Sequence, residues 1–379
     1  MKKIVFLTGT RADFGKLKSL MSISQNSSEF EVHIFVTGMH MSSLYGSTVD
    51  EIVKAGFKNI YKYINHNSSE SMDRNLAKTI DGFSQYIEHL NPDLIVVHGD
   101  RVEALAGAIV GSLNNILVAH IEGGEVSGTI DELIRHSVSK MSHIHLVANN
   151  EAKNRLIQLG EFKKSIFILG SPDLDLMNES SLPDFKKAKD YYNIPFNEYA
   201  IAMFHPITTD YNNITNYAKN FVDAIIKSDI NYILVFPNND LGSKEILKEL
   251  EILKSIKRIK IFPSLRFEYF LRFLKESKFI IGNSSAGIRE APYYNVPTID
   301  IGTRQNNRAK LDTIYNCSYQ LEDILETIKK VKEMKKTTVE TNDFHFGTGR
   351  SDKLFLKLLR SKEFWNIDHQ KQFQEFKNS

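Results

Sequence analysis

Acidic side chains stand where two apolar segments of the chain end, and they are the first candidates for chemistry. Asp100 follows the apolar run Leu94–His98, and Glu122 follows the run Ile116–Ile121. The stretch between them, Arg101–Leu113, has helical spacing and small residues. A strand, helix and strand of this length run with the strands parallel, and neighbouring strands lie about 4.8 Å apart. We therefore expect Asp100 and Glu122 close together at the carboxyl edge of a sheet, where open α/β sheets bind ligands.

A third acid, Asp131, begins the next predicted helix, and Arg135 lies four residues further on, on the same helix face. Three carboxylates at one crevice suit general acid–base catalysis, because burial and neighbouring acids raise a carboxyl pKa. The structural alternative is that these acids pair with Arg101 and Arg135, or that Asp100 caps the helix starting at Arg101. Asp131 would then only stabilise a first helical turn.

Two further strand ends in the predicted sheets carry basic groups. The loop Gly9–Gly15 places Arg11 at a strand-to-helix turn, where backbone N–H groups and a guanidinium bind anions. It matches neither the Walker loop nor the dinucleotide fingerprint, and Arg11 paired with Asp13 would make it an ordinary turn. His205 ends the first strand of the second half of the chain and is a candidate phosphate contact.

The segment Gly282–Glu290 combines a strand end, two serines and a helix start. Free N–H groups, the hydroxyls of Ser284 and Ser285 and the helix dipole would together bind a phosphate. Glu290 lies further along that helix, where its carboxylate could reach a ribose. Simple capping by either serine is the structural alternative. Arg304, in the next strand-end loop, is a further anion-binding candidate.

Composition excludes several classes of protein. The chain has 379 residues, 42% hydrophobic and 25% charged, as in globular proteins with two domains. A net charge of +2 argues against nucleic-acid binding, and the single Cys317 excludes an internal disulfide and a cysteine metal cluster. No histidine motif predicts a metal site. The first apolar run ends at Gly9 and no run approaches the ~18 residues of a membrane span, so we expect a cytoplasmic protein.

Strand-like runs alternate with helical stretches along the whole chain, which predicts α/β architecture with parallel sheets covered on both faces. A break follows Gly170–Pro172, and the pattern restarts near Tyr199. We expect two Rossmann-like, doubly wound domains that face each other across a cleft. Their expected ranges are residues 1–172 and 196–361.

Several ordered motifs resemble one known family, the hydrolysing UDP-N-acetylglucosamine 2-epimerases of bacterial sialic-acid synthesis. The motifs are GTRADFGK, TGMH, HGDRVEALAGA, HIEGGEVSGTIDELIRH, MFHPITT, PNND, FPSLRFEYF, GNSSAGIREAP and IGTRQNNR. The resemblance implies the fold of the B-type glycosyltransferases, with UDP bound mainly by the second domain. It also implies a C-terminal helix, placed at residues 362–379, that crosses back to the first domain.

The resemblance implies the reaction of UDP-GlcNAc with water to give N-acetylmannosamine and UDP through 2-acetamidoglucal, the first step of sialic-acid synthesis. No cofactor is implied, and the enzyme is expected to form a homodimer or homotetramer. The implied residue roles are as follows: acid/base groups Asp100, Glu122 and Asp131; a group for the departing UDP, His205; diphosphate ligands Arg11, Ser284, Ser285 and Arg304; ribose ligand Glu290; positioning groups Arg101, Arg135 and Asn239.

Three alternatives stay open. Non-hydrolysing relatives carry GTRPE, QGDT and HVEAGLR where this chain has GTRAD, HGDR and HIEGGE, which favours the hydrolysing branch. The same hydrolysis on a UDP- or GDP-linked 2,4-diacetamido-trideoxy sugar, for legionaminic acid, is the first alternative. A retaining glycosyltransferase of this fold is the second. A non-catalytic nucleotide-sugar sensor is the third, and the three carboxylates argue against it.

Overall fold

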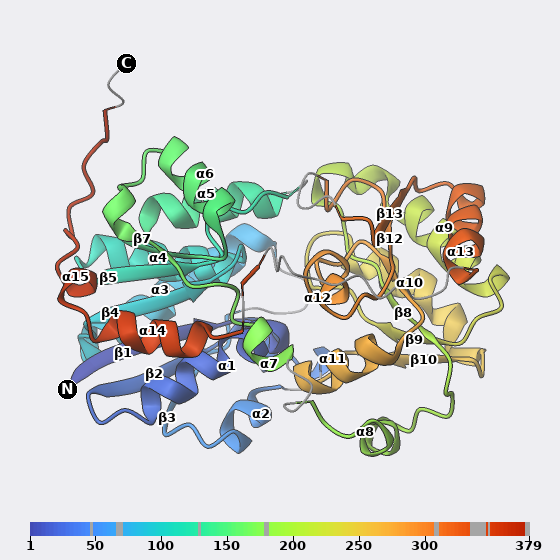
Figure 1. The fold of residues 1–379 in the computed structure, drawn as a ribbon, viewed down its shortest axis with the longest axis horizontal. Helices are drawn as coiled ribbons and strands as arrows, with labels where there is room; N and C mark the ends of the chain where they lie inside the picture. The colour runs from blue at the N-terminus through green and yellow to red at the C-terminus, as the bar shows by residue number, and fades with distance from the viewer. Residues whose placement is uncertain are drawn as a thin grey trace. The chain divides into compact units, whose positions relative to one another are not determined.

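The chain forms two compact units. The computed structural model describes residues 1–45, 48–65, 71–127, 130–177, 182–306, 311–333, 346–347 and 349–375. Unit 1 comprises Met1–Glu125, Asp131–Leu176 and His345–Ser379, and unit 2 comprises Val126–Ile130 and Met177–Phe344. Each unit contains a parallel sheet with flanking helices, so the predicted α/β class with two doubly wound sheets is confirmed (Figure 1).

The sheet of unit 1 has seven parallel strands in the order β3-β2-β1-β4-β5-β6-β7. The order reverses direction at β1 and β4, which is the topological switch point where such sheets bind ligands. The strands are β1 (Lys2–Thr8), β2 (Phe30–Val36), β3 (Asn59–Lys62), β4 (Leu94–His98), β5 (Leu117–Ile121), β6 (Ile144–Val147) and β7 (Ile166–Ile168). The helices are α1 (Arg11–Gln25), α2 (Val49–Lys54), α3 (Met72–Leu90), α4 (Val102–Leu113), α5 (Ile130–Met141), α6 (Asn150–Gln158) and α7 (Leu174–Met177).

Alternate residues of the central strands pack against different helices, which explains why these strands are apolar throughout. Ile4 and Phe6 of β1 belong to one core with Leu17 of α1. Leu7 of β1 points to the other face, where its side chain lies close to Gly107 of α4. Burial on both faces removes the polar alternation that a one-sided sheet would show.

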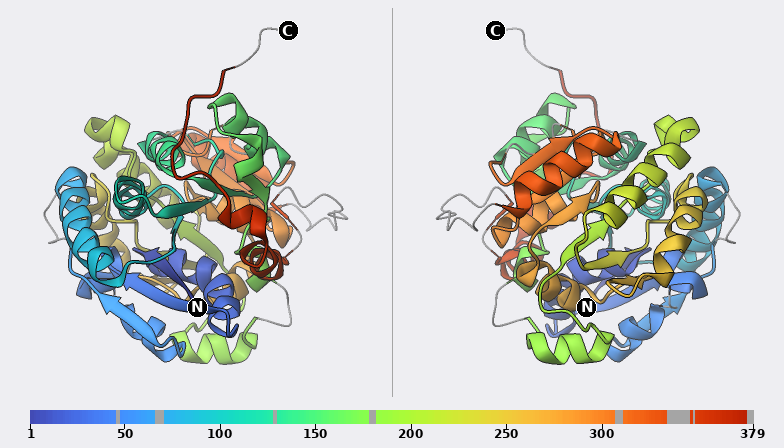
Figure 2. Two further views of the ribbon diagram at one scale, coloured as in Figure 1. Left: turned by 90° about the vertical axis from the view of Figure 1, so that its left-hand side faces the viewer. Right: turned by 90° about the vertical axis from the view of Figure 1, so that its right-hand side faces the viewer.

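The last described segment of the chain returns to unit 1. It contains α14 (Ser351–Leu359) and α15 (Lys362–Trp365). The carboxylate of Asp175 accepts hydrogen bonds from the backbone N–H groups of Ser351 and Asp352, at 2.8 and 2.9 Å, and so caps the start of α14. The Lys2 ammonium lies 4.1 Å from the centroid of the Trp365 indole, so α15 lies beside the start of β1 (Figure 2).

The expected continuous helix over residues 362–379 is wrong. Within its described part, residues 362–375, the segment contains α15 alone, and residues 366–375 form no helix. The backbone N–H of Gln370 bonds instead to the Asp368 side chain at 2.9 Å, a local bond that competes with helix formation. Both α14, which lies wholly before residue 362, and α15 contribute side chains to the core of unit 1, among them Phe355 and Phe364.

The sheet of unit 2 has six parallel strands in the order β10-β9-β8-β11-β12-β13. The strands are β8 (Ala200–Met203), β9 (Tyr232–Val235), β10 (Ile259–Phe262), β11 (Ile280–Gly282), β12 (Thr298–Ile301) and β13 (Ile314–Cys317). The helices are α8 (Phe185–Tyr192), α9 (Ile214–Lys227), α10 (Ser243–Leu250), α11 (Phe267–Glu276), α12 (Ala286–Tyr293) and α13 (Leu321–Lys332). Among the described residues, no helix has the length and apolar character needed to cross a membrane.

Candidate active site

The pairing of β4 with β5 brings the two acidic strand ends together in unit 1. His98 pairs with Ile121 at the last position of the ladder, and the N–H of Gly99 donates to the carbonyl of Ile121 at 3.0 Å. Asp100 and Glu122 therefore follow adjacent strands at the same sheet edge. Both lie on the carboxyl side of the sheet, next to the switch point between β1 and β4.

Arg135 of α5 is buried among acids at this edge. Its guanidinium donates to the Asp100 carboxylate and, at 3.3 Å, to the carbonyl of Glu125. The side chain of Arg135 is 1% exposed. Burial opposes its charge, but Asp100, Glu125 and Asp131 outweigh burial and raise the pKa of Arg135. Arg135 is thus a permanent cation that ties α5 to the end of β4.

This arrangement decides between the two structural alternatives for Asp100. The N-cap of α4 is Arg101, and no side chain makes a cap hydrogen bond there, so the alternative that Asp100 caps this helix is wrong. The alternative of ion pairing is correct for Asp100 and Arg135. Arg101 instead lies near Glu103, with 3.8 Å between Nε and Oε2. Asp131 lies in the first turn of α5.

His98 is a site residue that the sequence interpretation did not single out. Its Nδ1 lies 2.8 Å from Oδ1 of Asp13, and its Nε2 lies 3.1 Å from Oε1 of Glu122. The available signal was its position as the last residue of β4, directly before Gly99 and Asp100. A side chain at that position can point along the same edge as the acids that follow it.

The loop after β5 has a backbone path that brings it close to its neighbours. Glu122 has φ +67°, and its N–H donates to the carbonyl of Leu146 at 3.2 Å. Gly124 has φ +77°, and a Cβ there would lie 2.2 Å from the carbonyl oxygen of Ala152. Only glycine fits at that position, because α6 packs directly against the backbone. The loop is therefore held against β6 and α6.

In the Gly9 loop, Arg11 pairs with a different acid from the one expected. Arg11 pairs with Glu51 at 2.6 Å, so the alternative that Arg11 pairs with Asp13 is wrong. Thr10 caps α1 by accepting from the N–H of Asp13 at 3.1 Å. The buried Glu103 packs against Gly9, where a Cβ would lie 3.0 Å from its carboxyl carbon. These contacts set the start of α1 at the same sheet edge as β4.

The candidate phosphate site of unit 2 is organised by Asn283. Its side-chain carbonyl accepts from the N–H of His205 at 2.6 Å, and its amide donates to the carbonyl of His205 at 2.9 Å. The N–H of Asn238 donates to Nδ1 of His205 at 3.1 Å, which places the ring hydrogen of a neutral His205 on Nε2. Asn283 is fully buried, and sequence reasoning did not assign it a role.

The start of α12 completes the candidate phosphate site. Ser285 is the N-cap and makes no side-chain cap bond, whereas Oγ of Ser284 accepts from the N–H of Ala286 at 3.3 Å. Arg304 donates to the carbonyl of Asn283 at 3.2 Å. Helix N–H groups, hydroxyls and a guanidinium therefore converge in this loop, and together they suit an anion.

Three further features of unit 2 lie close by. Glu290 of α12 is 2% exposed, and Asn239 follows Asn238 in the loop after β9. Burial raises the pKa of Asp300 on β12 to about 7, although the charge of Arg304 opposes this. The described residues include no group of three or more His, Cys, Asp and Glu side chains that could hold a metal ion.

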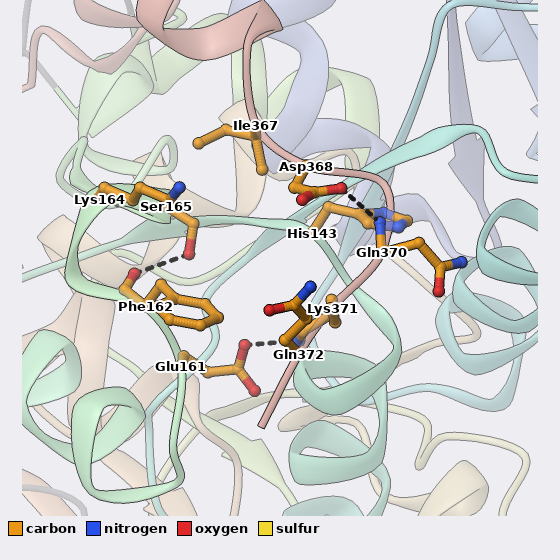
Figure 3. A pocket seen from close by; sticks show the side chains of 10 residues that line it. All are labelled: His143, Glu161, Phe162, Lys164, Ser165, Ile367, Asp368, Gln370, Lys371 and Gln372. Carbon is orange, nitrogen blue, oxygen red and sulfur yellow. Dashed lines mark hydrogen bonds and ion pairs between the residues drawn. The ribbon is translucent and has the colours of Figure 1, made fainter. Parts of the chain in front are cut away.

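A second buried ion cluster lies at the amino ends of β6 and β7 in unit 1. The carboxylate oxygens of Glu161 lie 2.9 Å from Nε2 of His145, 2.9 Å from Nζ of Lys140 and 2.5 Å from Nζ of Lys371. Lys371 also donates to the carbonyls of Ser139, Lys140 and Ser142 at the end of α5. The segment around Lys371 lines a cavity of about 200 Å³ (Figure 3). This cluster anchors the last described residues away from the acidic edge.

Comparisons with known proteins identify relatives of this chain. A family model described as UDP-N-acetylglucosamine 2-epimerase matches residues 22–360. The chain is 47% identical over 373 residues to "UDP-N-acetylglucosamine 2-epimerase" of Neisseria meningitidis, covering 98% of this chain and 99% of that protein. It is 32% identical over 367 residues to "UDP-N,N'-diacetylbacillosamine 2-epimerase (hydrolyzing)" of Legionella pneumophila, covering 95% and 96%.

Solved structures show the same fold. The chain superposes on the UDP-GlcNAc 2-epimerase of Methanocaldococcus jannaschii, solved with UDP-GlcNAc and UDP, with a TM-score of 0.80. That match covers 95% of this chain and 99% of the other, at 24% identity. The family model, the long relatives and the fold lead to one conclusion: the chain belongs to the UDP-N-acetylglucosamine 2-epimerase family.

Proposed function

We propose that this chain is a hydrolysing 2-epimerase that converts UDP-GlcNAc and water to N-acetylmannosamine and UDP. The observation that carries the proposal is the pair of ion-paired carboxylates at one sheet edge of unit 1. Asp100 is held by Arg135, and Glu122 by His98. Such carboxylates are positioned groups for moving a proton on a sugar ring, in a chain whose family acts on nucleotide sugars.

The proposed reaction has two steps. In the first, a carboxylate accepts the proton from sugar carbon 2, the C–H electron pair forms the double bond to carbon 1, and UDP leaves with the C1–O pair. In the second, water adds across that double bond, with a hydroxyl at carbon 1 and a proton at carbon 2 on the opposite face. Asp100, Glu122 and Asp131 are the proposed acid/base groups. A carbon acid this weak requires a base held in place.

Unit 2 is proposed to hold the UDP. The N-terminus of α12, with Ser284 and Ser285, and the guanidinium of Arg304 would bind the diphosphate, and Glu290 would bind the ribose. His205 would contact the phosphate that leaves, since a neutral ring with its hydrogen on Nε2 can donate to an oxygen. Arg11, Arg101 and Asn239 complete the proposed set of substrate contacts.

The degree of similarity supports the choice of UDP-GlcNAc as the substrate. The Neisseria relative, named for UDP-GlcNAc, is far more similar than the Legionella relative, named for the diacetamido sugar. The Legionella relative's name includes hydrolysis, which supports release of free UDP rather than of UDP-ManNAc. Production of N-acetylmannosamine would place the enzyme at the first step of sialic-acid synthesis. Hydrolysis of a UDP- or GDP-linked diacetamido sugar remains the second candidate.

The products distinguish these possibilities. The purified chain is incubated with UDP-GlcNAc, and nucleotides are separated by anion exchange while free sugars are identified by mass and retention. We expect equal amounts of UDP and N-acetylmannosamine. UDP-ManNAc without UDP would show a non-hydrolysing epimerase, and turnover of only the diacetamido substrate would select the second candidate. Binding of UDP with no turnover of either sugar would favour a sensor.

Location and assembly are part of the same proposal. A soluble nucleotide sugar as substrate and a single free, buried cysteine, Cys317, fit the reducing cytoplasm. We propose a homodimer or homotetramer, as the resemblance to the family implies. Light scattering coupled to size exclusion measures this directly, and a mass of 43.4 kDa would show a monomer.

A further inference from the structure

We infer that Asp13 and His98 form a buried charged bridge that holds Glu122 as an anion in one orientation. His98 is thereby a positioning residue, acting through Glu122 and supported in turn by Asp13. The catalytic consequence of the bridge rests on the proposed function. The charge state of the bridge is a property of the protein alone.

Both nitrogens of the His98 imidazole face a carboxylate oxygen at ion-pair distance. Nδ1 faces Oδ1 of Asp13 at 2.8 Å, and Nε2 faces Oε1 of Glu122 at 3.1 Å. Ionised carboxylate oxygens only accept hydrogen bonds, and a neutral imidazole has a single N–H to donate. Two carboxylates in ion-pair contact with opposite sides of one ring therefore favour the imidazolium of His98, which places a cation between two anions.

All three side chains are removed from solvent. The exposed fractions are 8% for His98, 12% for Asp13 and 6% for Glu122. An isolated charge at such depth is strongly disfavoured, and a cation between two anions compensates most of that cost. Burial therefore couples the charge states of the three groups, because neutralising one of them leaves the charges of the others without compensation.

Each end of the bridge is fixed by its own contacts. Oδ2 of Asp13 accepts from the N–H of Gly9 at 3.1 Å, and the N–H of Asp13 donates to Thr10 at the start of α1. Oε1 of Glu122 also accepts from Oγ of Ser171 at 3.3 Å. The left-handed backbone of Glu122, at φ +67°, is a strained conformation for a residue with a side chain. The bridge thus joins α1, β4 and the loop after β5.

The charged groups around His98 favour its cationic form. Burial alone would lower its pKa, but the charge of Glu122 and the interactions with Asp13 outweigh burial and raise the pKa of His98 to about 10. His120 on β5 is neutral, because burial lowers its pKa to about 3 while its nitrogens meet Gly99 and Ser139. Arg135 adds positive charge near Glu122 and so favours the anion there.

A carboxylate held in its ionised form can begin the reaction only as a proton acceptor. Glu122 can accept a proton from the substrate, but it has none to give while His98 stays charged. The bridge therefore assigns Glu122 to proton acceptance, and the proton that adds to carbon 2 during hydration comes from another group. Asp13, which acts through His98, should influence the reaction less than His98 does.

The first test measures the charge of His98 without substrate. Imidazole resonances of the whole chain are followed by NMR from pH 5.5 to pH 9, and His98 is assigned by its loss in His98→Gln. We expect His98 to stay in the imidazolium form throughout, and Asp13→Asn to move its titration down by about two pH units, the range such neighbouring charges produce. A wild-type His98 that titrates near its ordinary value would overturn the inference.

The second test measures turnover against pH. In His98→Gln we expect kcat at pH 6 to fall about 100-fold, within the range for a general base, with KM changed less than about 3-fold and activity partly recovered at pH 8. Recovery follows because a buried carboxyl without a neighbouring cation needs a higher pH to ionise. Asp13→Asn should show the same pH shift with a smaller loss. A uniform loss at every pH would overturn the inference.

A matched histidine provides the control. His33 on β2 lies 2.8 Å from Glu31, the same distance as from His98 to Asp13, but at a different part of the sheet. His33→Gln should leave the pH profile unchanged, and a shift equal to that of His98→Gln would count against a specific bridge. Failure of the wild-type chain to turn over UDP-GlcNAc would refute the proposed function alone, because the NMR titration still decides whether the charged bridge exists.

Discussion

The guanidinium of Arg135 on α5 donates to the carboxylate of Asp100, at the point where β4 ends. This contact joins a helix to a sheet edge that carries a second acid, Glu122, on the adjacent strand. The cation is buried, so its position depends on the acids around it. The edge is therefore a balanced set of charges, and changing one member should alter the others.

Replacing Asp100 by Asn removes a charge while keeping the shape of the side chain. We expect kcat to fall by about 10²–10⁴-fold, the usual contribution of one acid/base group. The affinity for UDP should change little, because Asp100 is not among the expected diphosphate ligands, which are Arg11, Ser284, Ser285 and Arg304. Turnover and calorimetric binding of UDP measure the two effects. Asp81→Asn, on α3 where Asp81 accepts from Gln85 at 3.1 Å, is the control, and an equal loss in both variants would contradict a role for Asp100.

Arg135→Met tests the buried pair by leaving Asp100 without its cation. We expect the free energy of unfolding to fall by about 3 kcal/mol, since breaking a buried pair exposes an uncompensated charge. Urea denaturation measures this loss. Arg360→Met is the control, because Arg360 pairs with Glu29 at the surface, and its loss should cost less than about 1 kcal/mol. An equal free energy of unfolding in the two variants would show that the buried pair of Arg135 and Asp100 contributes no more stability than a surface pair.

Arg304→Met tests the candidate phosphate site of unit 2. Loss of a charged hydrogen-bond donor costs about 1.5–3 kcal/mol, which corresponds to a Kd for UDP raised about 10- to 100-fold. Arg304→Lys should lose less, because it keeps the charge without the planar fork. Isothermal titration calorimetry with UDP gives the three affinities. Unchanged binding in Arg304→Met would remove Arg304 from the diphosphate ligands, and Arg258→Met, which disrupts a pair with the exposed Asp229, should bind normally.

The pH dependence of stability should report on Glu161. Burial would raise its pKa, but His145 and Lys371 outweigh burial and lower the pKa of Glu161 to about 2. Figure 3 shows the Glu161 carboxylate beside Lys371. A carboxyl whose folded pKa is depressed adds stability above its ordinary pKa of 4.5 and loses it as the pH falls toward 2.

Glu161→Gln should therefore lower the free energy of unfolding by about 3 kcal/mol at pH 7 and by much less near pH 3. Urea denaturation at both pH values measures the difference. Lys371→Met should be destabilising as well and should make the C-terminal segment more sensitive to protease, whereas Lys164→Met, at the exposed rim of the same cavity, should not. An equal loss of unfolding free energy in Glu161→Gln at both pH values would contradict the lowered pKa of Glu161.

The central strands of both sheets could be predicted because burial on both faces makes them continuous apolar runs. Among the edge strands, β7 and β10 could be predicted as well, whereas β3 and β13 could not. β3, with sequence NIYK, is mostly exposed, and β13, with sequence IYNC, is only partly buried, so neither has an apolar run. The end of the C-terminal helix was also mispredicted, since a local Asp368 bond replaces helical ones after α15.

The candidate site could be predicted only where it follows from local order. Strand, helix and strand in sequence predict that Asp100 and Glu122 lie side by side. The contacts of His98 with Asp13 and of Lys371 with Glu161 join segments far apart in the chain, and no local pattern specifies which cation meets which acid. Asn283 was missed for a similar reason, because its role is to bond the backbone of His205 across two strands.

The most direct measurement is proton NMR of the purified chain with UDP-GlcNAc in D₂O. We expect α-N-acetylmannosamine that carries deuterium at carbon 2 to appear together with an equal amount of UDP. Deuterium at that carbon requires removal of its proton, and free UDP requires cleavage of the C1–O bond. An unchanged spectrum, or UDP-ManNAc formed without release of UDP, would contradict the proposed hydrolysing epimerisation.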